Sequence, residues 1–142
     1  MEGDCFGCGD DNPVGLGLQF SVAPPGLVAS FLPRPEHRGG PGRLHGGLAA
    51  TCLDETMGAL GFALDGTHCV TATLDLRYRR PVPIDGTAVR VEAWRERPEA
   101  RRRQKVHGRL LLADGRVAVE ATGIFVQVGA GEGGGPWEGV VR

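Results

Sequence analysis

Residues 44–66, LHGGLAATCLDETMGALGFALDG, decide the fold because they contain the only clear helical pattern of the chain. The stretch lacks proline, and its large apolar residues follow the i, i+4, i+7, i+11 spacing of one helical face. These residues are Leu53, Met57, Leu60 and Leu64. The Asp65-Gly66 pair is typical of a helix end. The sequence therefore predicts one helix from about Gly46 to Leu64.

Alternating apolar and polar residues predict six strands around this helix. Two strands are expected before it, at residues 14–22 and 27–32, separated by a turn at Pro24-Pro25-Gly26. Four are expected after it, at residues 69–80, 87–97, 106–114 and 116–128. The Asp114-Gly115 pair between the last two is a strong hairpin signal.

The strand at residues 69–80 is expected to separate its side chains onto two faces. One face would hold Val70, Ala72, Leu74, Leu76 and Tyr78, and the other Thr71, Thr73, Asp75, Arg77 and Arg79. Hairpin-linked strands favour an antiparallel sheet, and a single apolar helix can cover one face of it. We predict one α+β domain at residues 1–128, with the helix wrapped by the sheet, and a Gly-rich tail at residues 129–142.

Composition limits the classes of function. The chain has 142 residues, a hydrophobic fraction of 41% and a formal net charge of −1. These values indicate a globular domain and argue against bulk electrostatic binding to nucleic acid. No window approaches the roughly 18 apolar residues of a membrane-spanning helix, and the acidic N-terminus does not resemble a signal peptide. We expect a cytoplasmic protein with reduced cysteines and with neither nucleic acid nor membrane as a partner.

Asp54 stands out because it is a carboxylate on a largely apolar helix. Its neighbours on the same helical face are all small, namely Gly47, Ala50, Gly58 and Gly61. Glycine within a helix costs about 1 kcal/mol relative to alanine, so several on one face indicate close approach of another backbone or a ligand. Asp54 is alternatively a solvent-facing or ion-paired residue, and Glu55 an exposed or structural one.

The helix start is a second candidate feature. The N–H groups of Gly46 and Gly47 lack partners within the helix, and the helix dipole favours negative charge there. Asp54 lies about 12 Å further along by helix rise. Two antiparallel helices of a dimer would bring Asp54 of one chain toward Gly46 of the other, which predicts a composite site. His45 is alternatively a plain capping or loop residue.

Three elements together resemble a known family. They are His45-Gly46-Gly47, Asp54 nine positions after the histidine, and the strand TATLDLRYRRPVP at residues 71–83. This combination resembles the hotdog-fold acyl-CoA thioesterases of the PaaI type. The opening CFGCGDDNPVGLGLQF at residues 5–20 is similar to the branch that contains the human THEM-type thioesterases.

The resemblance implies a hotdog fold and a homodimer or dimer of dimers with active sites at the subunit interface. It implies that Asp54 is the general base or nucleophile of thioester hydrolysis and that the Gly46 N–H polarises the thioester carbonyl. His45 would shape the turn and Thr71 would orient the water or the carboxylate. Many PaaI-type members carry Asn six residues before the histidine, where this chain has Gly39.

Candidate substrate-binding residues lie at the helix start and at the end of the following strand. Gly47 belongs to the first group, and Arg77, Arg79 and Arg80 form the second. Arginine binds phosphate bidentately, and coenzyme A carries several phosphate charges. Arginines at a strand end are otherwise simply solvated, which is also the preferred interpretation of the run at residues 101–103.

Cys5 and Cys8 have the spacing of half a zinc site. A second pair is missing, because Cys52 falls in the predicted helix and Cys69 begins a strand. We therefore expect no metal, no redox site and no cofactor. A phosphate loop and a Gly-x-Ser-x-Gly element are also missing from the sequence.

Two other functional classes remain as alternatives to a thioester hydrolase. A hotdog domain can be a non-catalytic acyl-CoA-binding module. A hotdog dehydratase would need an Asp and His arrangement that this sequence does not show.

Overall fold

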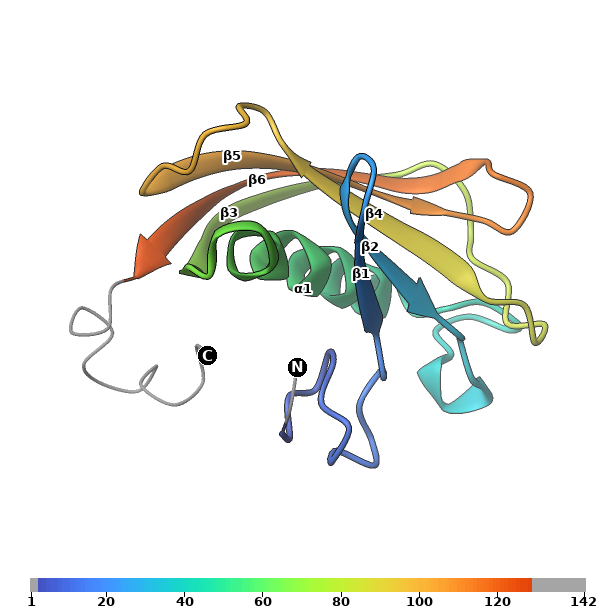
Figure 1. Cartoon of the computed structure of the whole chain (residues 1–142). Coiled ribbons are helices and arrows are strands. Elements are labelled where there is room, and N and C mark those ends of the chain that lie inside the picture. The colour runs from blue at the N-terminus through green and yellow to red at the C-terminus, as the bar shows by residue number, and fades with distance from the viewer. Residues whose placement is uncertain (1–2, 129–142) are drawn as a thin grey trace.

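The computed structural model describes residues 3–128, so the predicted tail at residues 129–142 lies outside the described part. One long helix, α1 (Gly46–Asp65), packs against one antiparallel sheet of six strands in the order β1-β2-β4-β5-β6-β3. Figure 1 shows the sheet curving over α1. The strands are β1 (Gln19–Ala23), β2 (Gly26–Phe31), β3 (His68–Tyr78), β4 (Val89–Arg95), β5 (Arg103–Leu111) and β6 (Val117–Val128). The predicted α+β class is confirmed.

The core forms between α1 and the concave face of the sheet. Leu53, Met57 and Leu60 are at most 1% exposed, as the helical spacing predicts. Leu64 is 39% exposed, so the prediction that it shares the buried face is wrong. A Cβ at Gly108 of β5 would lie 2.7 Å from Met57 Sδ, and glycine there lets the sheet approach the helix closely.

Two strands begin three or more residues away from the predicted position. β1 begins at Gln19 rather than at residue 14, because Leu16 N–H and Leu18 N–H donate to the carbonyls of Phe6 and Gly7. The segment before β1 therefore pairs with the N-terminal loop instead of with a strand. β5 begins at Arg103, earlier than predicted, because residues 103–105 pair with β6.

β3 contains an irregularity that changes its faces. Its register with β6 shifts between Thr71 and Thr73, where an extra residue enters the strand. Leu74 and Leu76 pack on the core as expected, but Thr71 also lies on the helix side. The predicted strict alternation, with Thr71 opposite Leu74, is therefore wrong. A β-bulge is invisible to a pattern with a fixed period of two.

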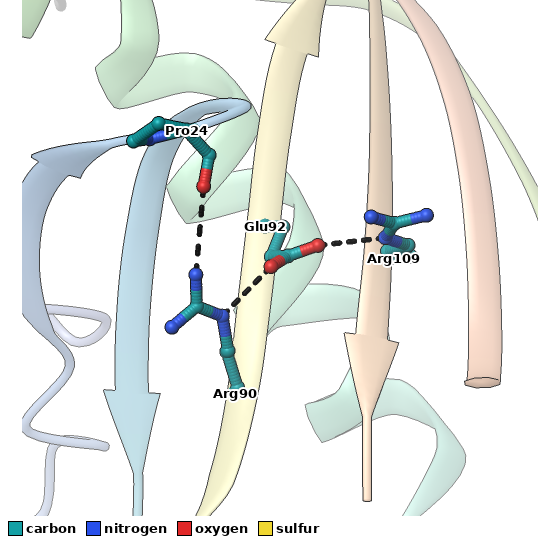
Figure 2. A network of polar contacts seen from close by, with 4 residues as sticks. All are labelled: Pro24, Arg90, Glu92 and Arg109. Atoms are coloured by element: carbon teal, nitrogen blue, oxygen red, sulfur yellow. Dashed lines mark hydrogen bonds and ion pairs between the residues drawn. The ribbon is translucent and has the colours of Figure 1, made fainter. Parts of the chain in front are cut away.

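A buried carboxylate lies on the side of the sheet that faces away from α1. Glu92 of β4 accepts hydrogen bonds from Arg90 Nε and Arg109 Nε, both at 2.7 Å, and Arg90 Nη2 reaches the Pro24 carbonyl at 3.5 Å (Figure 2). Burial raises the pKa of Glu92, but the hydrogen bonds and charges of Arg109 and Arg90 outweigh it and hold the pKa below its usual range. The network joins β4 to β5 and to the β1–β2 turn.

Candidate active site

His45 caps the start of α1. Its Nδ1 accepts a hydrogen bond from Gly47 N at 2.9 Å, and its backbone N–H donates to the carbonyl of His37. His37 is 4% exposed, so this backbone hydrogen bond joins the helix start to a buried residue. Nδ1 is the acceptor in this contact. The structure thus places His45 as a capping residue.

The cap leaves one amide of the first turn available. Leu48 N and Ala49 N donate to the His45 carbonyl and Gly47 N donates to the His45 ring, whereas Gly46 N has no acceptor within residues 3–128. Gly46 is exposed, and this N–H lies at the positive end of the helix dipole. It therefore has the chemistry of a donor to a developing oxyanion.

Tyr78 holds this first turn in place. Its hydroxyl donates to the Gly46 carbonyl at 2.6 Å, which ties the end of β3 to the start of α1. Sequence analysis assigned Tyr78 only to an apolar strand face and missed this contact. One signal could have indicated this hydrogen bond. Tyr78 ends the alternating face of its strand, and that end of the strand lies close to the glycine-rich start of the helix in the fold.

Asp54 is half-buried and is anchored by β3. Thr71 Oγ1 donates to Asp54 Oδ1 at 2.6 Å. The β-bulge after Thr71 directs this hydroxyl toward the helix. Within the described residues no Lys or Arg pairs with Asp54, so the ion-paired alternative does not hold. The second oxygen of Asp54, Oδ2, has no donor among residues 3–128.

Asp54 and Gly46 lie eight positions apart on the same helix. That separation is about 12 Å along the axis, so a single chain does not bring the carboxylate and the amide onto one small substrate. The structure therefore pairs Asp54 with Thr71 and Gly46 with Tyr78, as two separate groups.

The glycines near Asp54 differ in the space that a side chain would find at each position. A Cβ at Gly61 would lie 3.0 Å from Cys69 Sγ and 3.1 Å from Thr67 Oγ1, so the close approach there comes from the same chain. A Cβ at Gly58 would make only ordinary contact with Phe125, at 3.5 Å. At Gly61 the expected close approach is present, since the backbone oxygen of Thr67 also lies 3.3 Å from the Cβ position, and it comes from the same chain. Approach by a partner chain or a ligand stays a prediction for Gly47 and Ala50.

Gly39 has a steric reason in this chain. A Cβ at Gly39 would lie 2.9 Å from His45 Cα and 3.4 Å from His45 Cβ. The position at which many PaaI-type proteins carry Asn therefore cannot hold a side chain without moving the helix cap.

The three candidate phosphate-binding arginines differ in the hydrogen bonds and ion pairs that they make within the chain. Arg79 pairs with Glu120, with Nη2 to Oε2 at 2.9 Å, and Arg80 Nη1 donates to the Val117 carbonyl at 2.7 Å. The side chain of Arg77 is exposed and makes neither a hydrogen bond nor an ion pair with another residue between 3 and 128. Of the three, Arg77 has the guanidinium that is most available to a ligand.

Glu55 makes a contact that sequence analysis missed. It is half-buried, as a structural residue would be, and its Oε1 accepts from Cys5 Sγ at 3.2 Å and from Cys8 Sγ at 3.1 Å. Burial raises the pKa of the Cys8 thiol well above its usual value, and the hydrogen bond and charge of Glu55 raise it further. The spacing of the two cysteines was the only signal, because Glu55 lies about 50 residues away in sequence.

None of the helices within residues 3–128 has the length and apolar character needed to cross a membrane.

The sequence of this chain is similar to those of known thioesterases. The Thioesterase superfamily profile matches residues 41–119. Acyl-coenzyme A thioesterase THEM4 of Xenopus laevis is 32% identical over 121 residues, which cover 80% of this chain and 52% of that protein. The THEM4 protein of Bos taurus is 28% identical over 118 residues, which cover 80% of this chain and 48% of the relative. The chain thus spans about half the length of the curated relatives it matches.

Solved structures of thioesterases also resemble this chain. A thioesterase superfamily protein superposes with a TM-score of 0.73 and 27% identity, over 83% of this chain and 60% of that chain. A phenylacetic acid degradation-related protein of Ralstonia eutropha gives a TM-score of 0.68 and 26% identity, over 78% of this chain and 85% of that chain. The second match supports the PaaI-type resemblance, and both confirm the hotdog fold. The long helix, the sheet around it and the matched residues 41–119 together show that this chain belongs to the thioesterase superfamily.

Proposed function

We propose that this protein hydrolyses an acyl- or aryl-CoA thioester to the free acid and CoA. The observation that carries the proposal is the Asp54 carboxylate, fixed by Thr71 through one oxygen and open at the other. Membership of the thioesterase superfamily and the names of the THEM4 relatives support the same reaction. The substrate is taken to be a CoA thioester because the curated relatives are acyl-coenzyme A thioesterases.

The proposed site is composite and forms in a homodimer or a dimer of dimers. One chain separates Asp54 from Gly46 by more than two helical turns, so a partner helix running antiparallel would supply the missing group. The edge of β3 that faces away from β6 has no strand partner within residues 3–128, and Thr71, Ala72 and Thr73 are exposed there. Such an open edge is suited to pairing with a second chain.

In the proposed reaction the Gly46 N–H of one chain donates to the thioester oxygen, with His45 holding the turn that aims it. Asp54 of the other chain takes a proton from water that attacks the carbonyl carbon, or attacks that carbon itself. Collapse of the tetrahedral intermediate breaks the C–S bond and releases CoA as a thiolate, which takes up a proton from Asp54 or from solvent. If Asp54 has attacked the carbon itself, water then hydrolyses the resulting acyl anhydride to the free acid and restores the carboxylate. Gly47 borders the acyl group, and Arg77 is the best placed of the three arginines to contact a CoA phosphate.

The alternative is a non-catalytic module that only binds acyl-CoA. The purified protein should release free thiol from at least one member of a panel of short, long and aromatic CoA esters, and light scattering should give a dimer or a larger even oligomer. Tight binding of CoA esters without thiol release would favour the binding module, and formation of an alkene would indicate a dehydratase. We also expect the protein in the cytoplasm, because four free thiols suit a reducing compartment.

Thr71→Val should lower kcat by about 10-fold to 100-fold with little change in KM. A hydrogen bond to a charged group contributes about 1.5–3 kcal/mol, and each 1.4 kcal/mol corresponds to a factor of ten. Thr71→Ser keeps the hydroxyl and should retain most of the rate. Steady-state kinetics of the three proteins with one ester measures this, and a valine variant with the original kcat would show that Thr71 does not orient the carboxylate.

A further inference from the structure

The N-terminal loop before β1 places two thiols in contact with the carboxylate of Glu55 on α1. Cys5 Sγ and Cys8 Sγ lie 3.2 Å and 3.1 Å from the same oxygen of Glu55. All three potential ligand atoms lie within 4.8 Å of one another. In Figure 1 the loop that carries both cysteines runs beside the helix, before β1.

The charge of Glu55 is incompletely balanced by these contacts. Glu55 is half-buried, and within residues 3–128 it has no Lys, Arg or His partner. Thiols are weak hydrogen-bond donors. Buried carboxylates in proteins are usually paired with a cation or coordinated to a metal. The two groups that donate to Glu55 are thiols, which can themselves bind a metal ion.

Two glycines allow the close approach of the loop. A Cβ at Gly7 would lie 2.5 Å from Glu55 Cγ, and a Cβ at Gly9 would lie 2.4 Å from Cys5 N. A backbone hydrogen bond of 2.9 Å from Gly9 N to the Cys5 carbonyl closes the turn. The turn therefore holds both sulfur atoms on the side that faces the helix.

We propose that Cys5, Cys8 and Glu55 form a binding site for Zn²⁺, with water in the fourth position. Zinc takes thiolate sulfur at about 2.3 Å and carboxylate oxygen at about 2.0–2.2 Å in tetrahedral geometry. Those bond lengths place sulfur and oxygen about 3.5 Å apart, so the ligands need to separate by only a few tenths of an ångström. As the two Zn–S bonds form, the two thiol protons pass to solvent, and the two positive charges of the ion offset two of the three negative charges of its ligands.

The bound ion would fasten the N-terminal loop to the middle of α1, one residue away from Asp54. This role is independent of the proposed hydrolysis, because none of the three ligands takes part in that chemistry. It also gives the Cys5-x-x-Cys8 pair a third protein ligand, Glu55, which the sequence alone did not indicate.

The test is metal binding by the full chain. The reduced, metal-free protein should take up one equivalent of Zn²⁺, and Co²⁺ in its place should give sulfur-to-metal charge-transfer bands and the visible bands of a tetrahedral ion. Cys5→Ser and Cys8→Ser should each weaken Zn²⁺ binding by at least about 100-fold and Glu55→Gln by at least about tenfold. Cys69→Ser removes a thiol outside the cluster and should bind as the unaltered protein does.

A second measurement uses no variant and avoids any loss of folding. Zn²⁺ should protect Cys5 and Cys8 from alkylation, with the modified residues identified by mass spectrometry, and a chelator should remove the protection. Absence of stoichiometric binding by the reduced protein, equal binding by the Cys8→Ser protein, or a Cys5–Cys8 disulfide in protein purified without oxidant would each overturn the proposal.

Discussion

Asp54→Asn is expected to lower the turnover of CoA thioesters by about 10²–10⁴-fold, the range that general acid–base catalysis contributes. Asparagine can still accept the Thr71 hydrogen bond, so the side chain should keep its place. Its amide can neither take a proton from water nor attack the thioester carbon. Thiol release measured at saturating ester should therefore fall, while the circular dichroism spectrum and the oligomeric state stay unchanged.

Asp75→Asn is the matched control for this experiment. Asp75 is an exposed aspartate of β3, and its substitution makes the same chemical change at a position outside α1. We expect it to change kcat less than twofold or so, within the usual effect of a surface substitution. Unchanged turnover in Asp54→Asn would refute the role of Asp54 and leave the fold assignment intact.

Glu92→Ala should lower the free energy of unfolding by about 2–3 kcal/mol. Removing one partner of a fully buried ion pair costs about 3–5 kcal/mol, because the other charge is left without a partner. The Glu92 side chain is only 8% exposed, but those of Arg90 and Arg109 are 50% and 42% exposed and can turn toward water. The expected loss is therefore smaller than for a pair that is buried on both sides.

Urea unfolding measures this loss as a lower midpoint at an unchanged slope. Glu120→Ala is the control, since it removes an exposed ion pair with Arg79 and should cost at most about 1 kcal/mol. Thiol release should be unaffected in both variants, because Glu92 lies on the side of the sheet away from α1. Equal losses for Glu92 and Glu120 would contradict the stabilising role of the buried network.

The sequence predicts the parts of this fold that repeat. The helix at Gly46–Asp65 and its buried Leu53, Met57 and Leu60 follow from spacing, because one amphipathic face has to meet the sheet. The six strands follow from alternation, with errors at their ends and at the bulge within β3. Leu64, in the last turn of α1, does not follow the pattern, because it is 39% exposed.

The site is predicted less completely, since its contacts join distant or irregular segments. Asp54 and His45 can be singled out from the sequence, but the contact from Thr71 to Asp54 depends on a bulge that period-two reasoning places on the wrong side. The contacts of Cys5 and Cys8 with Glu55 cross about 50 residues. The proposed composite arrangement would need a second copy of the chain, and the spacing of residues within one chain does not specify how two copies pair.

The imidazole cap at the start of α1 has a consequence for selectivity. Since His45 occupies the amide of Gly47, this end of the helix presents a single donor where an uncapped end would offer several. One donor suits the lone oxygen of a carbonyl, whereas a phosphate or carboxylate group seeks two or three at once. In the proposed mechanism, the cap would therefore disfavour binding of the charged end of a nucleotide-bearing ligand at the place of the acyl carbonyl.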